Sequence, residues 1–437
     1  MVPGRADVKF PATHDLRLRL HELDLPVLSS PKPLVACNET SLRIALSNAV
    51  SGDTIDLSAC VASVITLTQG ALHINADDVT LIGPGADQLT IDGGAGTGHN
   101  NKVFDHTGQG TLWIVGLAID DAHYIGQTTA NGGCIYSSGS VRLSQSTVSD
   151  CTVEAPSTSN AYALGGAIYA NGSVTLESSV ISANAAISAH NGAYGGGVFV
   201  RGNFMGTYAT IANNLAIAPT AYSYGGGVAV VGSGDFTLTN STLFGNAAQI
   251  GGALGIETAG TSMVLSSTIS QNFASLYVGG AAFGHDVSIT SSTITANIAS
   301  YSVLGLGVNT FGILAAQSSI IANNVNEGGT FDVSAQSIDG YGNLILVASA
   351  PLPADTQTAC PRLSPLRDNG GNTLTQMPSS GSPVIDWGYD MGLTSDQRGI
   401  GFPRVSGTWA DIGAVEWQGT IDDEIFRSAF EVSCDDY

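Results

Sequence analysis

The chain has 437 residues, 43% of them hydrophobic and 11% charged, and a formal net charge of −22 at pH 7. Between residues 103 and 340 the only basic side chains are Arg142 and Arg201. Binding to phosphate groups needs clustered Lys and Arg, so nucleic acid is disfavoured as a partner, and acidic polysaccharides are disfavoured for the same reason. No apolar run reaches the roughly 18 residues of a transmembrane helix, and we therefore expect no such segment.

The first 33 residues differ from the rest of the chain. They are polar, contain proline, and lack the roughly 7- to 15-residue apolar region of a secretory signal. We expect residues 1–33 to form a leader or a poorly ordered arm.

Residues 34–100 are expected to form an N-terminal cap and the first coils. A short helix with its N-cap at Thr40 or Ser41 is predicted from apolar residues at helical spacing, namely Leu42, Ala45, Leu46 and Ala49. The end of a stack of strands exposes unpaired backbone groups and open core, so a helix lying across it would serve as a lid.

One phrase is repeated through residues 101–345. Seven copies, such as "STISQN" and "STITAN", lie 25 to 33 residues apart, and glycine pairs recur with them. A period in this range indicates a solenoid, in which each unit buries its apolar face only against its neighbours. The asparagines that close the phrase are Asn184, Asn214, Asn246, Asn272, Asn297 and Asn323, and Cys151 takes that place in the first copy.

The sequence of the repeat unit predicts β-strands. Phrases such as "GSVTLESSVIS" alternate apolar and polar residues and are rich in Val, Ile and Thr. Units of this length joined by tight corners predict an all-β, single-stranded parallel β-helix. The closing Asn fits a corner because its short polar side chain tolerates the left-handed conformation, and stacked copies can form a hydrogen-bonded ladder. Glycine pairs would supply positive φ or a close backbone approach.

Six cysteines occur without a Cys-x-x-Cys pair, which indicates disulfides and an oxidising compartment. Six cysteines allow about 15 connectivities. We expect Cys37 to pair with Cys60 in the N-terminal cap and Cys134 to pair with Cys151 across one coil. Cys360 and Cys434 would then remain for each other.

Residues 346–417 predict an irregular C-terminal cap. Several charged residues in it resemble a site, namely Asp386, Asp396, Arg398, Asp411 and Glu416. Turn-rich loops need polar side chains to satisfy backbone groups, so we interpret Arg398 as a hydrogen-bonded anchor. Residues 418–437 form an acidic tail, interpreted either as an export or anchoring signal or as an exposed terminal segment.

Three segments resemble known families. "TSLRIALSNAVSGDTI" resembles the CSLREA-type segment at the start of many secreted β-helix proteins, and the repeats are similar to those of polymorphic outer-membrane proteins. "LSPLRDNGGNTLTQMPSSGSPVIDWG", "DQRG" and "DIGAVE" resemble the choice-of-anchor Q domain. The resemblance implies a right-handed parallel β-helix that is secreted or held at the outer-membrane surface of a bacterium. It implies no reaction. We expect no cofactor, with Ca²⁺ as the one alternative.

An enzyme of the pectin-lyase-like fold is the alternative. Hydrolysis of a glycosidic bond needs two carboxylates about 5 to 9.5 Å apart, and the best local cluster contains Asp105, Asp120 and Asp121. The rival interpretation of Asp120 and Asp121 is a solvated turn after a strand. A third oxygen donor from the next coil would make the same cluster a Ca²⁺ site.

Tyrosines recur between the closing phrase and the next glycine pair. Those expected to stack on one side include Tyr194, Tyr222, Tyr224 and Tyr277, with Tyr162 and Tyr301 in equivalent loops. Such a row suits contact with carbohydrate or with a surface protein, although an aromatic ladder that only stabilises the coil is equally consistent. The sequence favours a structural or adhesive surface protein without catalysis. A passive stalk and a polysaccharide-cleaving enzyme remain as alternatives.

Overall fold

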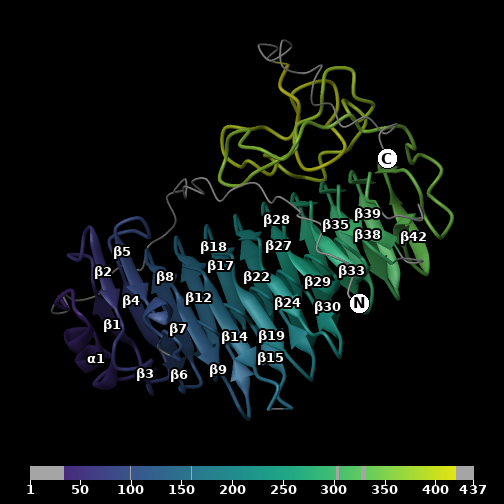
Figure 1. The fold of residues 1–437 in the computed structure, drawn as a ribbon. Coiled ribbons are helices and arrows are strands. Elements are labelled where there is room, and N and C mark those ends of the chain that lie inside the picture. The colour runs from purple at the N-terminus through teal and green to yellow at the C-terminus, as the bar shows by residue number, and fades with distance from the viewer. Residues whose placement is uncertain (1–33, 99, 159, 302–304, 326–330, 420–437) are drawn as a thin grey trace.

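The computed structural model describes residues 34–98, 100–158, 160–301, 305–325 and 331–419. Within these ranges the chain forms a parallel β-solenoid, in which successive turns add short strands to four sheets (Figure 1). The predicted all-β parallel helix is confirmed. The arm expected at residues 1–33 and the tail beyond residue 419 lie outside the described residues.

The helical cap is present and begins earlier than predicted. Helix α1 spans Glu39–Ser47, and its N-cap is Asn38, whose side chain accepts a hydrogen bond from the Ser41 amide at 2.9 Å. Thr40 and Ser41 therefore lie inside the helix. Asn38 is the better cap because it keeps an extended backbone conformation before the first turn. Leu42 and Leu46 pack into the core of the first turn.

Sheet 1 contains 11 parallel strands with inward Val, Leu and Ile side chains. Its strands are β1 (Asp53–Asp56), β4 (Val79–Ile82), β7 (Thr111–Val115), β12 (Ser140–Ser144), β17 (Val174–Glu177), β22 (Phe204–Thr207), β27 (Phe236–Thr239), β31 (Ser262–Leu265), β35 (Val287–Thr290), β39 (Ile313–Gln317) and β42 (Ser337–Tyr341). Leu81, Ile114, Leu143 and Leu176 are register partners, so one apolar side chain per turn stacks on the next.

Sheet 2 also has 11 strands and carries the most regular file of the core. Its strands are β2 (Ser63–Thr66), β5 (Leu89–Asp92), β8 (Ala118–Asp120), β13 (Thr147–Ser149), β18 (Val180–Ser182), β23 (Thr210–Ala212), β28 (Thr242–Phe244), β32 (Thr268–Ser270), β36 (Thr293–Thr295), β40 (Ile320–Ala322) and β43 (Leu344–Ile345). The central residue of nearly every strand is a buried Ile, Val or Leu. Stacked β-branched side chains suit a pleated, fully buried surface.

Sheets 3 and 4 complete each turn. Sheet 3 contains β3 (Leu72–Ile74), β6 (Phe104–His106), β11 (Ile135–Ser137), β16 (Ile168–Ala170), β21 (Val198–Val200), β26 (Val228–Gly232), β30 (Leu254–Thr258), β34 (Ala281–Phe283), β38 (Gly305–Thr310) and β41 (Phe331–Ser334). Sheet 4 contains β9 (Ala122–Ile125), β10 (Ala130–Asn131), β14 (Cys151–Ala155), β15 (Ala163–Leu164), β19 (Ala185–Ser188), β20 (Ala193–Tyr194), β24 (Leu215–Ile217), β25 (Ser223–Tyr224), β29 (Ala247–Ile250), β33 (Phe273–Tyr277) and β37 (Ile298–Ala299). Small buried alanines line much of sheet 4.

A ladder of buried asparagines runs along the corner between sheets 2 and 4. The backbone and side-chain amides of Asn246 both donate to the Oδ1 atom of Asn272, at 3.0 and 2.9 Å, and Asn272 repeats this with Asn297. The Asn272 side chain also donates to the carbonyl of Leu243 at 3.1 Å. The members are Asn184, Asn214, Asn246, Asn272, Asn297 and Asn324. Each side chain therefore satisfies backbone groups of adjacent turns.

Two details of the predicted ladder are wrong. Its last member is Asn324, whereas Asn323 precedes it with φ 56°. The left-handed residue of each corner is the one before the ladder position, such as Ala183 or Ala296, and the ladder asparagines themselves do not adopt positive φ. The turn needs the left-handed conformation one residue before the amide that points into the core.

The two glycines of each pair have different structural roles. Gly195 has φ 66°, and a Cβ on Gly196 would lie 2.4 Å from the carbonyl oxygen of Gly226 in the next turn. The first glycine thus permits the bend, and the second permits close stacking of turns. The serine of each "ST" phrase forms another ladder, as in the donation from the Ser241 amide to Ser267 Oγ at 3.1 Å.

Both of the better-defined disulfide predictions are confirmed. Cys37 is bonded to Cys60, and Cys134 is bonded to Cys151. Cys151 stands at the start of the asparagine ladder, where its amide donates to Asn184 Oδ1 at 3.0 Å. Cys434 lies outside the described residues, so its pairing with Cys360 stays a prediction.

The C-terminal region, residues 346–419, is irregular as expected. Its first part continues the stack at the C-terminal end, where Ala348, Ala350 and Leu352 pack against the core. The rest covers a side of the solenoid (Figure 1). The hydroxyl of Thr242 donates to the carbonyl of Leu374, and that of Thr268 donates to Gln397 Oε1, both at 2.6 Å. These threonines follow the ladder serines in sheet 2 and point outward. Their hydroxyls give the irregular segment a regular row of partners, which explains its lateral position.

Replacing a ladder asparagine should destabilise the protein more than replacing its left-handed neighbour. Asn272→Ala leaves the two donors of Asn246 without an acceptor in the core, which should lower the free energy of unfolding by about 2 to 4 kcal/mol. Asn323→Ala should cost less, because Ala183 and Ala296 already occupy equivalent positions. Urea unfolding followed by circular dichroism measures both variants. Equal destabilisation by the two substitutions would contradict the ladder assignment.

Candidate functional site

Four tyrosines from three successive turns form a continuous cluster on the outer face of sheet 4. Tyr194 in β20 and Tyr224 in β25 are register partners, and their rings stack with centroids 5.4 Å apart and planes 11° apart. Tyr162 lies 6.0 Å from Tyr194 and is tilted by 56°, while Tyr222 lies 6.4 Å from Tyr224 at 63°. We call Tyr162, Tyr194, Tyr222 and Tyr224 the tyrosine cluster.

The cluster has an inner and an outer pair. Tyr162 and Tyr222 are 49% and 55% exposed, whereas Tyr194 and Tyr224 are partly covered. Burial, followed by the charge of Glu257, raises the pKa of Tyr194 to about 12, so its hydroxyl remains protonated at neutral pH. The inner pair therefore supports two exposed rings.

The other predicted tyrosines do not join these ring contacts. Tyr277 in β33 is the register partner of Ile250, which is in turn paired with Tyr224. The isoleucine thus separates Tyr277 from the cluster by one turn. Tyr301 is 74% exposed and lies further along the solenoid.

A second aromatic row, which the sequence interpretation missed, lies on sheet 3. The rings of Tyr136, Tyr169 and Phe199 stack at 5.4 Å spacing, and Phe199 meets Tyr194 edge to face at 6.4 Å. Tyr169 and Phe199 are only 4% and 3% exposed, so this row stabilises the turns. Its signal was the aromatic residue four positions after the first glycine of each of the first three pairs, as in "GGAIY" and "GGGVF".

Lys102, which directly precedes the stretch whose only basic residues are Arg142 and Arg201, was not predicted as part of a site. Its ammonium group sits 4.1 Å from the ring centroid of Tyr124 and 4.5 Å from that of Tyr136. Burial lowers the pKa of Lys102 to about 8, although the charge of Asp105 opposes this. The lysine thus ends the aromatic row on sheet 3.

The three carboxylates of the predicted catalytic cluster belong to two environments. Asp105 is in β6 of sheet 3, where His73 Nδ1 lies 2.9 Å from its carboxylate. Asp120 is in β8 of sheet 2, where it accepts hydrogen bonds from Ser149 Oγ at 3.1 Å and the Asp121 amide at 2.9 Å. The hydrogen-bond partners of Asp105 and Asp120 are therefore separate sets.

Asp120 belongs to a group of neighbouring carboxylates, which we call the acidic corner and which comprises Asp92, Asp120, Asp121 and Asp150. Asp92 is its register partner, and burial, together with the charges of Asp121 and Asp92, raises the pKa of Asp120. Burial and the charges of Asp120 and Asp121 likewise raise the pKa of Asp150. Asp121 has φ 49°, as expected for a turn residue after a strand. Within the described ranges, no three His, Cys, Asp or Glu side chains are arranged to hold a metal ion.

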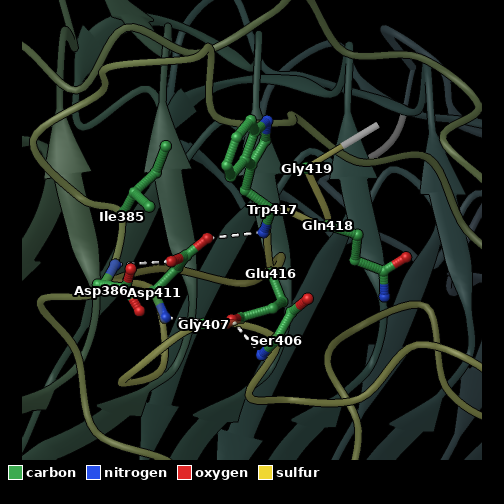
Figure 2. A pocket seen from close by; sticks show the side chains of 9 residues that line it. All are labelled: Ile385, Asp386, Ser406, Gly407, Asp411, Glu416, Trp417, Gln418 and Gly419. Carbon is green, nitrogen blue, oxygen red and sulfur yellow. Dashed lines mark hydrogen bonds between the residues drawn. The ribbon is translucent and has the colours of Figure 1, made fainter. Parts of the chain in front are cut away.

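The C-terminal region contains a cavity of about 140 Å³ lined by three carboxylates (Figure 2). Asp386 accepts hydrogen bonds from the amides of Thr408 and Trp409 at 2.6 and 2.9 Å. Asp411 accepts from the amides of Asp386 and Trp417, and Glu416 from those of Ser406 and Asp411. Each carboxylate thus holds two loop segments together, which is a structural task.

Arg398 has the anchoring contacts predicted for it. Its guanidinium group donates to Asp396 Oδ2 at 2.6 Å and to the carbonyl of Glu416 at 2.8 Å, and it packs 4.2 Å from the centroid of the Phe402 ring. Arg404, which is 1% exposed, donates to the carbonyl of Asp411 at 2.7 Å. These contacts fix the irregular loops around the cavity.

No family model and no curated protein matches the chain. A solved structure, "Crystal structure of pectate lyase Pel9A", is similar over 85% of this chain and 90% of that one, with 14% sequence identity and a TM-score of 0.36. Among the described residues, the only α-helix, α1, is too short to cross a bilayer.

Stability should increase as the pH falls from about 8 to about 5. Burial raises the pKa of Asp411 to about 6 and that of Glu416 to about 7, from ordinary values of 3.8 and 4.5. Burial also raises the pKa of Asp332 to about 6. The folded state therefore binds protons in this window that the unfolded chain does not, and the gain is lost as the pH rises.

Thermal unfolding at pH 5, 6, 7 and 8 tests this prediction. The Glu416→Gln variant, which cannot titrate at that position, should show a shallower dependence on pH. A melting temperature that instead rises steadily with pH would contradict the raised pKa values of these three groups.

Proposed function

We propose that the protein is a secreted or cell-surface β-solenoid with a structural and adhesive role, and that the tyrosine cluster is its contact surface. The observation that supports this is the pair of exposed rings, Tyr162 and Tyr222, held in place by the stacked rings of Tyr194 and Tyr224. Large aromatic rings at the surface of a soluble protein are typical of contact sites. The two disulfides are compatible with an extracellular location.

The geometry favours contact over mere stabilisation at this position. The buried row on sheet 3 already stacks Tyr169 on Phe199, in the turns that carry Tyr162 and Tyr194, so the exposed ring of Tyr162 is not needed to hold those two turns together. Aromatic side chains lose little conformational entropy when they bind, since they rotate about only two bonds, and they present a flat apolar face with a polar tip. The cluster thus has the properties of a binding surface.

Removing the outer rings should weaken adhesion and leave the fold intact. We expect the Tyr162→Ala/Tyr222→Ala double variant to lose at least about fivefold in retention on whole bacterial cells and on a panel of immobilised polysaccharides and proteins. Phe311→Ala, which removes a 75% exposed ring elsewhere, is the matched control. Unchanged retention of a correctly folded double variant would overturn this role.

A polysaccharide-cleaving enzyme is the second candidate, and the acidic corner is the observation that favours it. A general acid needs a raised pKa beside a second carboxylate, and Asp120 and Asp150 have raised pKa values near Asp121. Asp120 would protonate the leaving oxygen, with a neighbouring carboxylate as nucleophile or base.

Release of reducing sugar tests the second candidate. If the corner is catalytic, Asp120→Asn should reduce the rate by at least about 100-fold, while Asp87→Asn, at an exposed carboxylate outside the corner, should have no effect. Equal rates for the two variants, or no release by the wild type on neutral and acidic polysaccharides, would remove the enzyme interpretation.

A further inference from the structure

The two outer rings of the tyrosine cluster lie two turns apart. The register pairs Leu164 with Tyr194 and Tyr194 with Tyr224. Residues 162, 192 and 222 each precede these positions by two, so they form one file along the solenoid. Each turn adds about 4.8 Å, so Tyr162 and Tyr222 are separated by about 10 Å along the axis. Their rings are tilted by similar angles, 56° and 63°, against the inner pair.

The middle position of this file is Gly192. A Cβ there would lie 2.6 Å from Tyr194 Cε2 and 3.2 Å from Tyr162 Cδ1. Its φ is not positive, so the backbone conformation does not require glycine. The missing side chain instead leaves space for the rings of Tyr194 and Tyr162 to lie over the chain. The arrangement of the rings therefore depends on Gly192.

The charge around the cluster is negative. The carboxylate whose charge acts on the hydroxyl groups of Tyr194 and Tyr224 is that of Glu257. Arg201 lies over Phe199, and its Nε donates to the Tyr169 hydroxyl at 3.3 Å, so it is engaged with the sheet 3 row. A ligand rich in hydroxyl groups and without negative charge suits this surface, because tyrosine and glutamate both form hydrogen bonds with hydroxyls.

We propose, resting on the adhesive function above, that the tyrosine cluster binds a neutral β-1,4-linked polysaccharide that runs along the solenoid axis. In an extended chain of this linkage, alternate sugars present the same face, so the repeat is a disaccharide. The two-turn separation of Tyr162 and Tyr222 matches that repeat, and each ring packs against the apolar face of every second sugar. Glu257 and the tyrosine hydroxyls accept and donate hydrogen bonds at the sugar edges.

Affinity electrophoresis in hydroxyethyl cellulose and calorimetry with cellohexaose test this proposal, with polygalacturonate as the acidic comparison. The wild type should bind both neutral probes and should bind polygalacturonate at least about tenfold more weakly. Tyr162→Ala and Tyr222→Ala should each weaken binding about fivefold or more. Gly192→Ala, which removes no aromatic ring, should weaken binding to a similar degree by displacing Tyr194. Phe311→Ala should bind as the wild type does.

The outcomes separate this inference from the proposed function. Preference for polygalacturonate, or full binding by Gly192→Ala, would overturn the neutral-glycan site while the adhesive role could still stand on the cell-retention measurement. If the wild type binds no polysaccharide but the double tyrosine variant loses retention on immobilised proteins, the surface contacts protein and the inference fails. Near-ultraviolet circular dichroism reports the tyrosine environment and confirms that Gly192→Ala is folded.

Discussion

The structure depends on one constraint, namely that equivalent residues of successive turns must stack directly on one another along the solenoid axis. A turn of 25 to 33 residues has too little apolar surface to fold alone. Its corners leave backbone amides pointing into the core, where an unpaired donor is costly. The asparagine ladder meets this need because each Oδ1 atom accepts from the backbone and the side chain of the preceding turn. The glycine pairs, serine ladder and aromatic rows all follow the same alignment.

Much of the fold could be predicted because the sequence repeats the physical requirement in every turn. The phrase around Asn272 contains an outward Thr, an inward Ile and a corner amide, and each is needed at a fixed place. The error at Asn323 arose because "ANN" offers two adjacent asparagines. The spacing from the ladder serine distinguishes the two, because Asn272 and Asn297 follow their serines by five residues, as Asn324 follows Ser319.

The candidate site was less predictable, because it depends on distances between turns. The tyrosines of sheet 4 were found from their regular position, but the separation of Tyr277 from Tyr224 depends on the register of Ile250. Lys102 is isolated in sequence and gains its environment only from Tyr124 and Tyr136, which belong to other strands. Asp105 and Asp120 are close in sequence but occupy different sheets. Proximity along a solenoid therefore differs from proximity along the chain.

The lateral position of the C-terminal region has a mechanical consequence. Loops near residues 374, 397 and 414 are bonded to Thr242, Thr268 and Thr293, which belong to three consecutive turns far upstream in sequence. A bare stack of turns can unravel one turn at a time from its free end under tension. Here the C-terminal region is bonded to three turns at once, so a pulling force acts on several hydrogen bonds that must break together. The turns beneath this region should therefore be the last to unfold under tension.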